Sequence, residues 1–448
     1  MSSENVQESE PQREPKSLAY AWGVTICLSL GYALSFLDRE LLSLVIEPIK
    51  VSFELTDFQV SLLMGPAFAI FYTVMGIPLG WAADRYNRTR LIAVGMSLWS
   101  IMTAFCGFSA SFIQIFIARI GIGVGEAVLT PSAVSLLSDY FPKTKLPFAL
   151  SIYSIGMFIG AGMAGIGGGY VLTLLRDVTW TVPVFGTLVF WQIGFLIAAA
   201  PGILLALIIF LLREPKRKEM AIDAQGIEKK VSFPEAFNYM WDHKKLFLCL
   251  FIGGSMVAII QYQSLWYAEH FMRSWEWTRA QAGRATGLPT IIGGISGLLI
   301  GGYYMSFQAK KGAKDVALKL AFISAIGIAI PAVLMPLMTN TTLAIGGATL
   351  VKFFVAMPLI AGTTAIRMSV PNQMRGQFIA MYFVFIGLIG ANLGPVMPGF
   401  INTFIFGETN DMLGVSLSIS AALTIPFSTI LLWISWGEYK KHVYKNDK

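Results

Sequence analysis

The sequence predicts an all-α membrane protein with twelve transmembrane helices in two pseudo-symmetric six-helix bundles. Its composition is the first observation that predicts this, because 55 % of the 448 residues are hydrophobic and only 13 % are charged. A soluble protein needs charge on about a quarter of its residues. The other two observations are the number of long apolar stretches and one long polar interruption halfway along the chain.

The sequence contains about twelve apolar stretches that are long enough to cross a bilayer, which takes about 20 residues each. This predicts a helix for each stretch, and the even number places both termini on one side of the membrane. The stretches centre near 18–45, 59–81, 91–109, 111–137, 147–173, 187–212, 246–270, 283–305, 315–337, 342–367, 376–403 and 413–436.

The polar interruption separates six apolar stretches from the six that follow, so it predicts a linker between two bundles. Within it, residues 233–243 predict a short amphipathic helix at the membrane surface. The predicted units are a disordered N-terminus at 1–17, a first bundle at 18–212, a linker at 213–245, a second bundle at 246–436 and a tail at 437–448.

The distribution of basic residues predicts the orientation. The loops on the side of the termini carry most of the Lys and Arg, and cytoplasmic loops are enriched in these residues. We therefore expect a multi-pass protein of the cell (inner) membrane with the N-terminus, the linker and the tail in the cytoplasm. The opposite loops hold few basic residues, namely Lys50, Arg176, Arg273, Arg279 and Arg284.

Several function classes find no support in the sequence. The three cysteines lie in apolar runs, and the three histidines show no metal-ligand spacing, so we expect neither a metal nor a cofactor. No nucleophile–His–acid set is visible, which argues against an enzyme. The net charge of +7 is explained by the basic loops, so we expect no nucleic-acid partner. A non-transporting receptor would not need charges inside the membrane.

Such charges are the most informative feature of the chain. Asp38 and Arg39 lie inside the first apolar stretch, and Arg119 and Glu126 lie inside the fourth. A charge in a bilayer costs several kcal/mol unless it faces a water-filled path or a partner. These residues therefore predict a membrane transporter that binds, pairs or carries something at this position.

The expected depths of the four charged residues in the membrane allow them to lie close together. Asp38 and Arg119 each lie about eight residues, or about 12 Å, from the outer ends of their helices. Glu126 lies two turns farther on nearly the same face as Arg119. We predict one network facing a cavity, with Asp38 as the preferred proton carrier beside Arg39 and Arg119. Glu126 is predicted as a second proton site or a ligand for a cationic substrate group.

Two other interpretations of this network remain open. The charges can form a static lattice that joins two helices, although apolar packing is a cheaper way to do so. Alternatively, Arg39 and Arg119 can bind an anionic head group, because the guanidinium fork suits carboxylate or phosphate.

A charged motif follows the second helix. Residues 80–90 fit the pattern G-x-x-x-D-R-x-x-R-x-R, in which the glycine allows a close helix approach and the acid can pair with an arginine or a helix N-terminus. Arg88 and Arg90 are predicted to reach Asp139 at the end of the fourth helix. This predicts a cytoplasmic gate made of Gly80, Asp84, Arg85, Arg88, Arg90 and Asp139.

This pattern resembles motif A of the major facilitator superfamily, and the two-bundle layout resembles that superfamily over nearly the whole chain. Residues 35–39 (SFLDR) are similar to the N-Y-x-D-R of spinster-like members, with Ser35 in place of Asn. Residues 119–127 (RIGIGVGEA) are similar to their R-x-x-x-G-x-G-E-A. Gln192 stands where Arg is commoner. The resemblance implies that helices 1, 4, 7 and 10 line a cavity.

Further cavity candidates lie on other helices. Lys352 lies near the middle of the tenth helix, where it either faces the cavity or snorkels to the interface. Gln261 and Tyr262 suit a substrate with polar and apolar parts, whereas Trp266 and Tyr267 fit an interfacial aromatic belt equally well. Weaker candidates are Tyr153 and Tyr382.

The fifth helix is rich in glycine between residues 156 and 169, and similar spacing occurs at 287–297 in the eighth helix. Small residues at near-four spacing allow helices to pack closely. We therefore predict that these two helices pack against each other.

These observations predict a proton-coupled secondary transporter that works by alternating access around a midplane site. The resemblance implies a lysolipid or sphingoid-type lipid as substrate, with organic anions such as sugar acids, or drugs, as alternatives. The expected partners are the substrate, protons and membrane lipids, and we expect a monomer driven by the proton gradient.

Overall fold

The computed structural model describes residues 18–142, 144–183, 185–215, 217, 233–408 and 412–445. Twelve helical segments in this part are long and apolar enough to cross a membrane, which confirms the predicted fold. The predicted disordered segment 1–17 and most of the predicted linker lie outside the described residues.

Each predicted membrane segment corresponds to one helix or to several consecutive helical pieces. The first bundle contains α1 (Leu18–Ser43), α2 (Ile46–Phe53), α3 (Asp57–Met64), α4 (Pro66–Arg85), α5 (Arg88–Gly107), α6 (Phe112–Glu126), α7 (Leu129–Tyr140), α8 (Leu146–Met163), the π-turn η1 (Ala164–Gly168), α9 (Gly169–Leu174), β1 (Trp180–Val182), β2 (Gly186–Leu188) and α10 (Phe190–Phe210).

The second bundle follows the linker. It contains α11 (Phe233–Asp242), α12 (Lys244–Gln263), η2 (Ser264–Trp266), α13 (Tyr267–Trp275), α14 (Arg279–Lys310), α15 (Val316–Leu334), η3 (Met335–Leu337), α16 (Thr341–Ala356), α17 (Ala361–Ser369), η4 (Asn372–Met374), α18 (Arg375–Phe385), η5 (Ile386–Ala391), α19 (Asn392–Phe400), η6 (Ile401–Ile405) and α20 (Leu413–Lys445).

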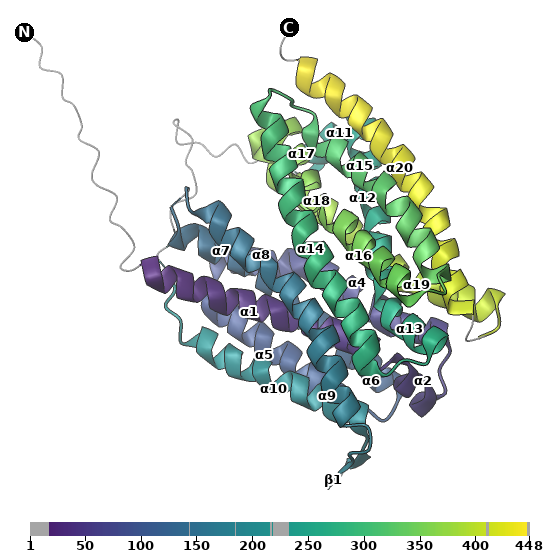
Figure 1. Cartoon of the computed structure of the whole chain (residues 1–448). Helices are drawn as coiled ribbons and strands as arrows, with labels where there is room; N and C mark the ends of the chain where they lie inside the picture. The colour runs from purple at the N-terminus through teal and green to yellow at the C-terminus, as the bar shows by residue number, and fades with distance from the viewer. Residues whose placement is uncertain are drawn as a thin grey trace, which may run out of the picture.

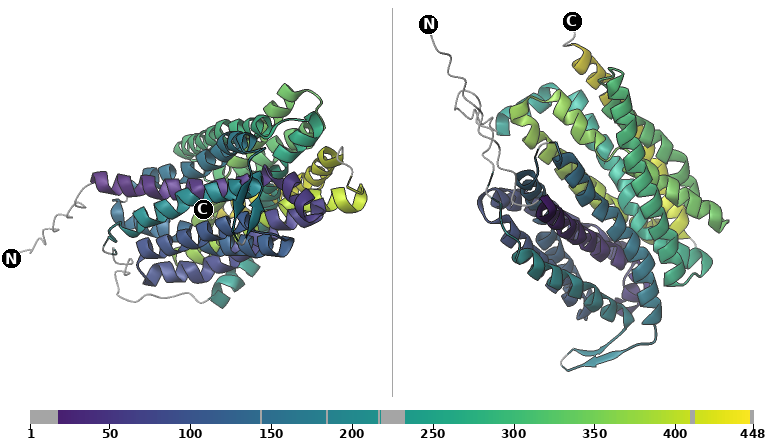
Figure 2. Two further views of the ribbon diagram at one scale, coloured as in Figure 1. Left: turned by 90° about the horizontal axis from the view of Figure 1, so that it is seen from below. Right: turned by 60° about the vertical axis from the view of Figure 1, so that its left-hand side comes forward.

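The two bundles pack against each other most extensively toward one end. Figure 1 shows them diverging toward the end at which α1 begins and α20 ends, and converging around α2 and α13. We call the first end the terminal side and the second the far side. Figure 2 shows the same two bundles, purple to teal and green to yellow, from two further directions.

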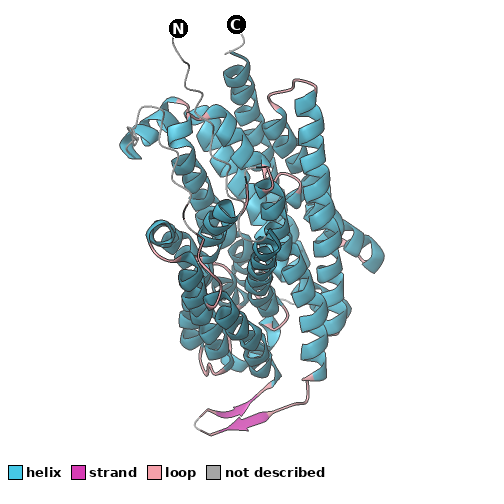
Figure 3. Cartoon of the chain, turned by 90° about the vertical axis from the view of Figure 1, so that its left-hand side faces the viewer, coloured by secondary structure: helices cyan, strands magenta, loops and turns pink. Residues whose placement is uncertain are grey.

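A β-hairpin and a long last helix were not predicted. β1 pairs with β2 in antiparallel register, with Trp180 opposite Leu188, and the hairpin projects beyond the helices in Figure 3. The segment predicted as a cytoplasmic tail, 437–448, continues the last helix as far as the structure describes it, because α20 extends to Lys445. Tyr439 and Val443 are buried against the second bundle, so this turn of helix gains packing that a free tail would lack.

The predicted amphipathic helix is confirmed as α11. Ala236 and Met240 are buried in the second bundle, whereas Phe237 and Trp241 are exposed and stack with ring centroids 6.3 Å apart. The helix therefore packs one apolar face inward and presents two aromatic rings outward.

Glycines set the close contacts between the bundles. The predicted packing of the fifth helix on the eighth is confirmed, since a Cβ on Gly283 would lie 2.0 Å from the Gly165 carbonyl oxygen. Gly65, where the second helix is interrupted between α3 and α4, lies against the backbone of α19 and η5. A Cβ there would lie 3.0 Å from the carbonyl oxygens of Ala391 and Asn392.

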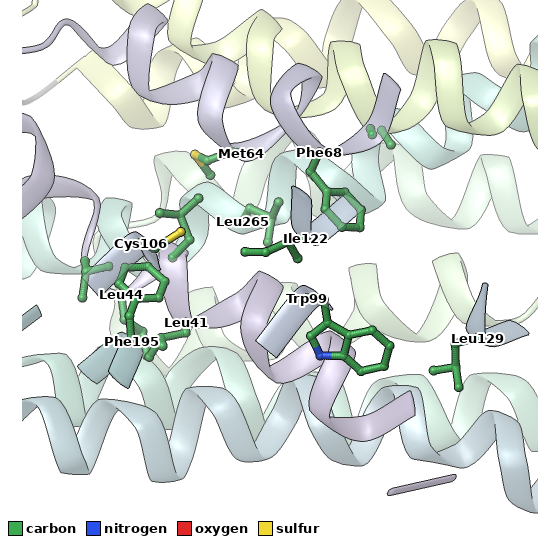
Figure 4. Packing of buried hydrophobic residues seen from close by; sticks show 14 of the residues in the cluster. Leu41, Leu44, Met64, Phe68, Trp99, Cys106, Ile122, Leu129, Phe195 and Leu265 are labelled. Atoms are coloured by element: carbon green, nitrogen blue, oxygen red, sulfur yellow. The ribbon is translucent and has the colours of Figure 1, made fainter. Parts of the chain in front are cut away.

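The buried apolar core is also continuous across the bundles. Its largest cluster combines side chains of the first bundle with Leu265, Trp266 and Phe271 of the second. Figure 4 shows Leu265 among Met64, Phe68 and Ile122. A second cluster, which includes Tyr439, draws only on the second bundle.

Candidate functional site

A cavity lies between the two bundles. It measures about 820 Å³ when its open mouth is included. Helices of both bundles contribute to it, including the first, fourth, seventh and tenth membrane segments, as the family resemblance implied. Its lining is mainly apolar, with Phe36, Met64, Phe68, Met157, Phe158 and Leu265, and its polar side chains are Arg39, Glu40, Arg119, Gln261, Tyr262, Thr290 and Lys352.

Arg39 and Glu126 form the ion pair of this site. The Arg39 Nη2 atom lies 2.5 Å from the Glu126 Oε2 atom, and Nε donates to the same oxygen at 2.9 Å. The Arg39 guanidinium also lies 4.4 Å from the ring centroid of Phe68 and 4.6 Å from that of Phe36. The pair therefore joins α1 to the end of α6, with Arg39 held in an aromatic cage at the cavity wall.

Asp38 lies behind the cavity wall. Its side chain is buried inside the first bundle, and its Oδ2 atom accepts a hydrogen bond from Thr103 of α5 at 2.9 Å. The same hydroxyl lies 3.0 Å from the Trp99 carbonyl oxygen, to which it can donate instead. Thr103 was not singled out in the sequence, where a threonine in an apolar helix carries little signal.

The expected partnership of Asp38 with Arg119 takes a different form. The Arg119 Nε atom donates to the Leu63 carbonyl at 3.2 Å, and its Nη1 atom is buried without a hydrogen-bond partner. Asp38 interacts electrostatically with Glu126, Arg119 and Arg39. Within the described residues, however, Asp38 forms no ion pair. The four charges are thus neighbours, and the hydrogen-bonded pair among them is Arg39 with Glu126.

Lys352 lines the cavity from the second bundle. Its Nζ atom donates to the Ser264 hydroxyl at 2.8 Å, so it does not snorkel to the interface. Glu40 lines the same cavity from α1 and interacts electrostatically with Lys352. Glu40 was not singled out in the sequence, although it directly follows Asp38 and Arg39 in an apolar stretch.

The aromatic candidates divide into two groups. Gln261 and Tyr262 line the cavity as predicted. Tyr153 and Tyr382 do not, which corrects their prediction as cavity residues. Tyr153 stacks on Tyr32 with ring centroids 4.7 Å apart, and Tyr382 packs against Gly254 and Gly362 inside the second bundle.

Trp266 and Tyr267 do not form an interfacial belt. Both side chains are buried, and the Trp266 indole N–H donates to the Pro395 carbonyl at 2.9 Å. The belt interpretation was therefore wrong, because the seventh helix turns this face toward the eleventh helix and the core.

The predicted gate motif is only partly assembled on the terminal side. Arg88 donates to Asp139 at 2.5 Å and to Glu214 at 2.6 Å, and all three residues belong to the first bundle or its exit. Arg90 is exposed and lies 6.0 Å from the Phe210 ring centroid, so the prediction that it reaches Asp139 was wrong.

The remaining motif residues make few contacts. Asp84 and Arg85 are exposed, and the Arg85 guanidinium lies 3.9 Å from the Trp81 ring centroid. A Cβ on Gly80 would meet its nearest neighbour, Pro131, at an ordinary 4.0 Å. The close helix approach expected at Gly80 is therefore absent from this arrangement of the bundles.

A second ionic cluster, on the far side, was not predicted. We call it the far-side cluster; it consists of Glu47, Lys50, Asp57, Glu269, Arg273 and Glu408. Arg273 donates to Asp57 at 2.8 Å and to Glu269 at 2.7 Å, and Lys50 lies 2.7 Å from Asp57 and 2.5 Å from Glu408. Glu47 completes it at 3.0 Å from Arg273. The pairs of Arg273 with Asp57 and Glu47, and of Lys50 with Glu408, connect the two bundles.

The electrostatics of Lys50 match this geometry. Lys50 lies in α2, between the first two membrane-spanning segments. Burial acts to lower the pKa of its ammonium group, but the hydrogen bonds to Asp57 and Glu408 outweigh it. The pKa of Lys50 therefore lies above its usual value, and the lysine stays charged within the cluster.

Known proteins resemble this chain over nearly its whole length. Residues 28–395 match the model of the Major Facilitator Superfamily. The crystal structure of a bacterial homolog of the human lysosomal transporter Spinster, in an inward-facing and unoccupied conformation, is 27 % identical. It matches with a TM-score of 0.78 over 97 % of this chain and 98 % of that chain.

Two curated relatives cover most of the sequence. An MFS-type efflux pump of Mycolicibacterium smegmatis is 25 % identical over 96 % of this chain and 95 % of its own length. The hexuronate transporter of Bacillus subtilis is 22 % identical over 84 % of this chain and 87 % of its own length. These relatives are transporters and not enzymes. This chain accordingly belongs to the Major Facilitator Superfamily, as a spinster-like, multi-pass membrane transporter.

Proposed function

We propose that this protein is a proton-coupled secondary transporter of an amphipathic or anionic small molecule, with a lysolipid or sphingoid-type lipid favoured. The observation that carries the proposal is the cavity between the bundles, whose mainly apolar wall holds a small set of charges. Such a lining suits a molecule with an apolar part and a charged head. The expected setting is the inner membrane, with the terminal side facing the cytoplasm.

Asp38 is the proposed proton site. A buried carboxyl group gains or loses a proton according to its solvation and its neighbouring charges. An ionised Asp38 accepts the Thr103 hydrogen at 2.9 Å. A protonated Asp38 can donate to the Thr103 oxygen while Thr103 donates to the Trp99 carbonyl at 3.0 Å. Thr103 therefore provides a hydrogen-bond partner for both protonation states.

Glu126 is the proposed second proton site. Its Oε2 atom holds Arg39, while its Oε1 atom is buried without a partner. Protonation of Glu126 would weaken its ion pair with Arg39, which lines the cavity. Proton binding and substrate binding would then be linked through Arg39, because a guanidinium released from its carboxylate can bind another anion.

Alternating access supplies the transport step. In the proposed cycle the bundles rock around the cavity, so the far-side cluster breaks when the cavity opens to that side. On the terminal side, a gate containing Gly80, Asp84 and Arg85 would close in the same movement. These residues make few contacts in the present arrangement, which is consistent with that gate being open.

Other substrates of the same superfamily are the alternative. The similarity to a hexuronate transporter supports an organic-anion or sugar-acid symporter, and the similarity to an efflux pump supports a multidrug/proton antiporter. In each alternative, the predicted coupling residues keep their roles and the occupant of the cavity changes.

Reconstituted liposomes with a trapped pH dye test the proposal. The panel is a lysophospholipid, a sphingoid phosphate, a sugar acid and a lipophilic cation, each offered to wild type and to the Asp38→Asn variant. We expect proton movement with the lysophospholipid or the sphingoid phosphate and none in the variant, although the variant melts at a similar temperature. Equal transport by both proteins under a pH gradient would refute coupling through Asp38. Transport without proton movement would identify a facilitator.

A further inference from the structure

We infer that Lys352 and Ser264 form a subsite for an anionic oxygen group of the substrate, a carboxylate or a phosphate, and that Glu40 is the internal counter-charge which this group replaces. The inference rests on the proposed transport function and adds the charge class and position of the ligand. It concerns charges on the cavity surface, as distinct from the Asp38 site behind it.

The side chain of Lys352 is directed into the cavity by its surroundings. On the α14 side, a Cβ on Gly293 would lie 3.1 Å from the Lys352 Cβ atom, so the stem of the lysine packs on a glycine. The ammonium group reaches Ser264 at 2.8 Å and lines the cavity. Three donor positions of an ammonium group cannot all be used on one hydroxyl, so donors remain for a ligand.

Lys352 has no carboxylate bound to it. Across the described ranges, it forms no ion pair, and its electrostatic partner is Glu40 on the opposite bundle. Both residues line the same cavity without a direct bond between them. A lysine in this position gains most from a ligand that brings a negative charge, because its own desolvation is otherwise poorly compensated.

The two cavity arginines are less available. Arg39 is held by Glu126 through two hydrogen bonds. Arg119 is 2 % exposed, and its guanidinium lies beside Phe68 and bonds a backbone carbonyl. Lys352, which is only partly buried, is therefore the cation that a ligand entering the cavity meets with least rearrangement.

Glu40 acts as a competitor for the ligand in this arrangement. Its charged neighbours on the cavity surface are Arg39 and Lys352. A carboxylate that already attracts the ammonium group lowers the gain from a second anion, so replacing Glu40 by a neutral residue should strengthen anion binding. This expectation has the opposite sign to that for Lys352, and a merely structural role of either residue would not produce it.

Direct binding to purified protein in detergent is the test. The probes are oleoyl lysophosphatidate, monooleoylglycerol as a neutral analogue with the same chain, oleylamine as a cationic one, and galacturonate as an anion without a chain. We expect Lys352→Gln to weaken lysophosphatidate binding by at least about tenfold, since a desolvated charge pair is lost. Binding of monooleoylglycerol should be unchanged. Ser264→Ala should weaken lysophosphatidate binding less, and Glu40→Gln should strengthen it about threefold or more.

Controls separate folding from binding. Lys441→Gln removes a lysine on the exposed end of α20 and should leave all affinities unchanged, and melting temperatures report the folding of every variant. Should Lys352→Gln fail to fold, Glu40→Gln and Ser264→Ala still test the sign pattern. Galacturonate binding that depends on Lys352 in the absence of lysophosphatidate binding would assign the anionic group to a sugar acid.

Failure of this inference differs from failure of the proposed function. Equal lysophosphatidate affinity in wild type and Lys352→Gln would overturn the subsite, as would a wild type that binds only the cationic or neutral probe. Binding with the expected sign pattern but without transport in liposomes would instead leave the subsite in place and refute the transport cycle.

Discussion

Each end of the molecule carries an ionic cluster. The far-side cluster joins the two bundles, whereas the cluster on the terminal side lies within the first bundle and its exit. On the far side, Arg273 of the second bundle holds Asp57 of the first at 2.8 Å. On the terminal side, Arg88 holds Asp139 at 2.5 Å and Glu214 at 2.6 Å, which are all parts of the first bundle and its exit. Because only the far-side cluster joins the bundles, it can open or close a path, whereas the Arg88 cluster stiffens one bundle.

Packing at the two ends agrees with this difference. On the far side, the bundles share one buried apolar cluster that includes Leu265 and Phe271, and Gly165 meets Gly283 there. Toward the terminal side, the second bundle has a cluster of its own around Phe247 and Tyr439. An ion-pair cluster therefore indicates a gate only when its members lie on both bundles. A cluster confined to one bundle stabilises that bundle instead.

The largest expected effect comes from breaking the far-side cluster at its centre. Asp57 is 0 % exposed, so Arg273→Met leaves it with Lys50 as its only cation, beside the Asn402 amide that donates to it at 2.6 Å, and deprives Glu269 of its partner. Removing one member of a buried ion pair costs about 3–5 kcal/mol. Here the loss mainly destabilises the arrangement in which the far side is closed. We expect the bundles to separate there. The measurement is the spin-label distance between exposed positions Val51 and Thr278 in a cysteine-free background.

The label distance should lengthen in Arg273→Met and keep its wild-type distribution in Lys441→Gln. An unchanged distance in Arg273→Met, together with an unchanged melting temperature, would show that apolar packing alone holds the far side closed.

The Arg88 cluster offers the matched contrast. Arg88 is 1 % exposed, while Asp139 and Glu214 are 9 % and 20 % exposed, so water can partly solvate the acids after Arg88→Met. We expect a loss of about 2–3 kcal/mol in stability, seen as a lower melting temperature. The Val51–Thr278 distance should not change. A lengthened distance would mean that the Arg88 cluster, like the far-side cluster, holds the two bundles together.

The sequence predicted those features of the arrangement that can be recognised within a single helix. Asp38 and Glu126 were predicted as site residues because a charge in an apolar helix is unusual. It can be recognised without knowing which residue it contacts. The far-side cluster was missed because its acids lie at helix ends, where charges are ordinary. Tyr153 and Tyr382 were misplaced because helix periodicity does not say which neighbour a face meets.

Partner choice was the other limit. The pairing of Arg39, and not Arg119, with Glu126 depends on the rotation of α1 against α6, which no spacing encodes. The packing of helix five on helix eight was predictable, because small residues in register are a property of each helix alone.

A smaller effect is expected from the glycine contact on the far side. In Gly283→Ala the new Cβ would lie 2.0 Å from the Gly165 carbonyl oxygen, and a backbone atom cannot rotate away. Overpacking of this kind costs about 1–3 kcal/mol, and separation of the bundles relieves it. We expect a longer Val51–Thr278 distance. Gly302→Ala on the same helix, where a Cβ meets nothing within 4 Å, is the control and should resemble wild type.

The smallest expected effect is the pH dependence of the Lys50 pairs. Because the pKa of Lys50 is raised by Asp57 and Glu408, the pairs contribute fully below the ordinary lysine pKa of about 10.4 and are lost as the pH rises through the higher pKa of the closed form. Although Asp57 is buried, Lys50 and Glu408 are partly exposed, so the pairs of Lys50 contribute about 1 kcal/mol or less. We expect Lys50→Gln to lengthen the Val51–Thr278 distance slightly at pH 7. Raising the pH above 10 should bring wild type toward the variant without changing the variant itself. A wild type that is more tightly closed at high pH would contradict this sign and assign closure to a group that must lose a proton.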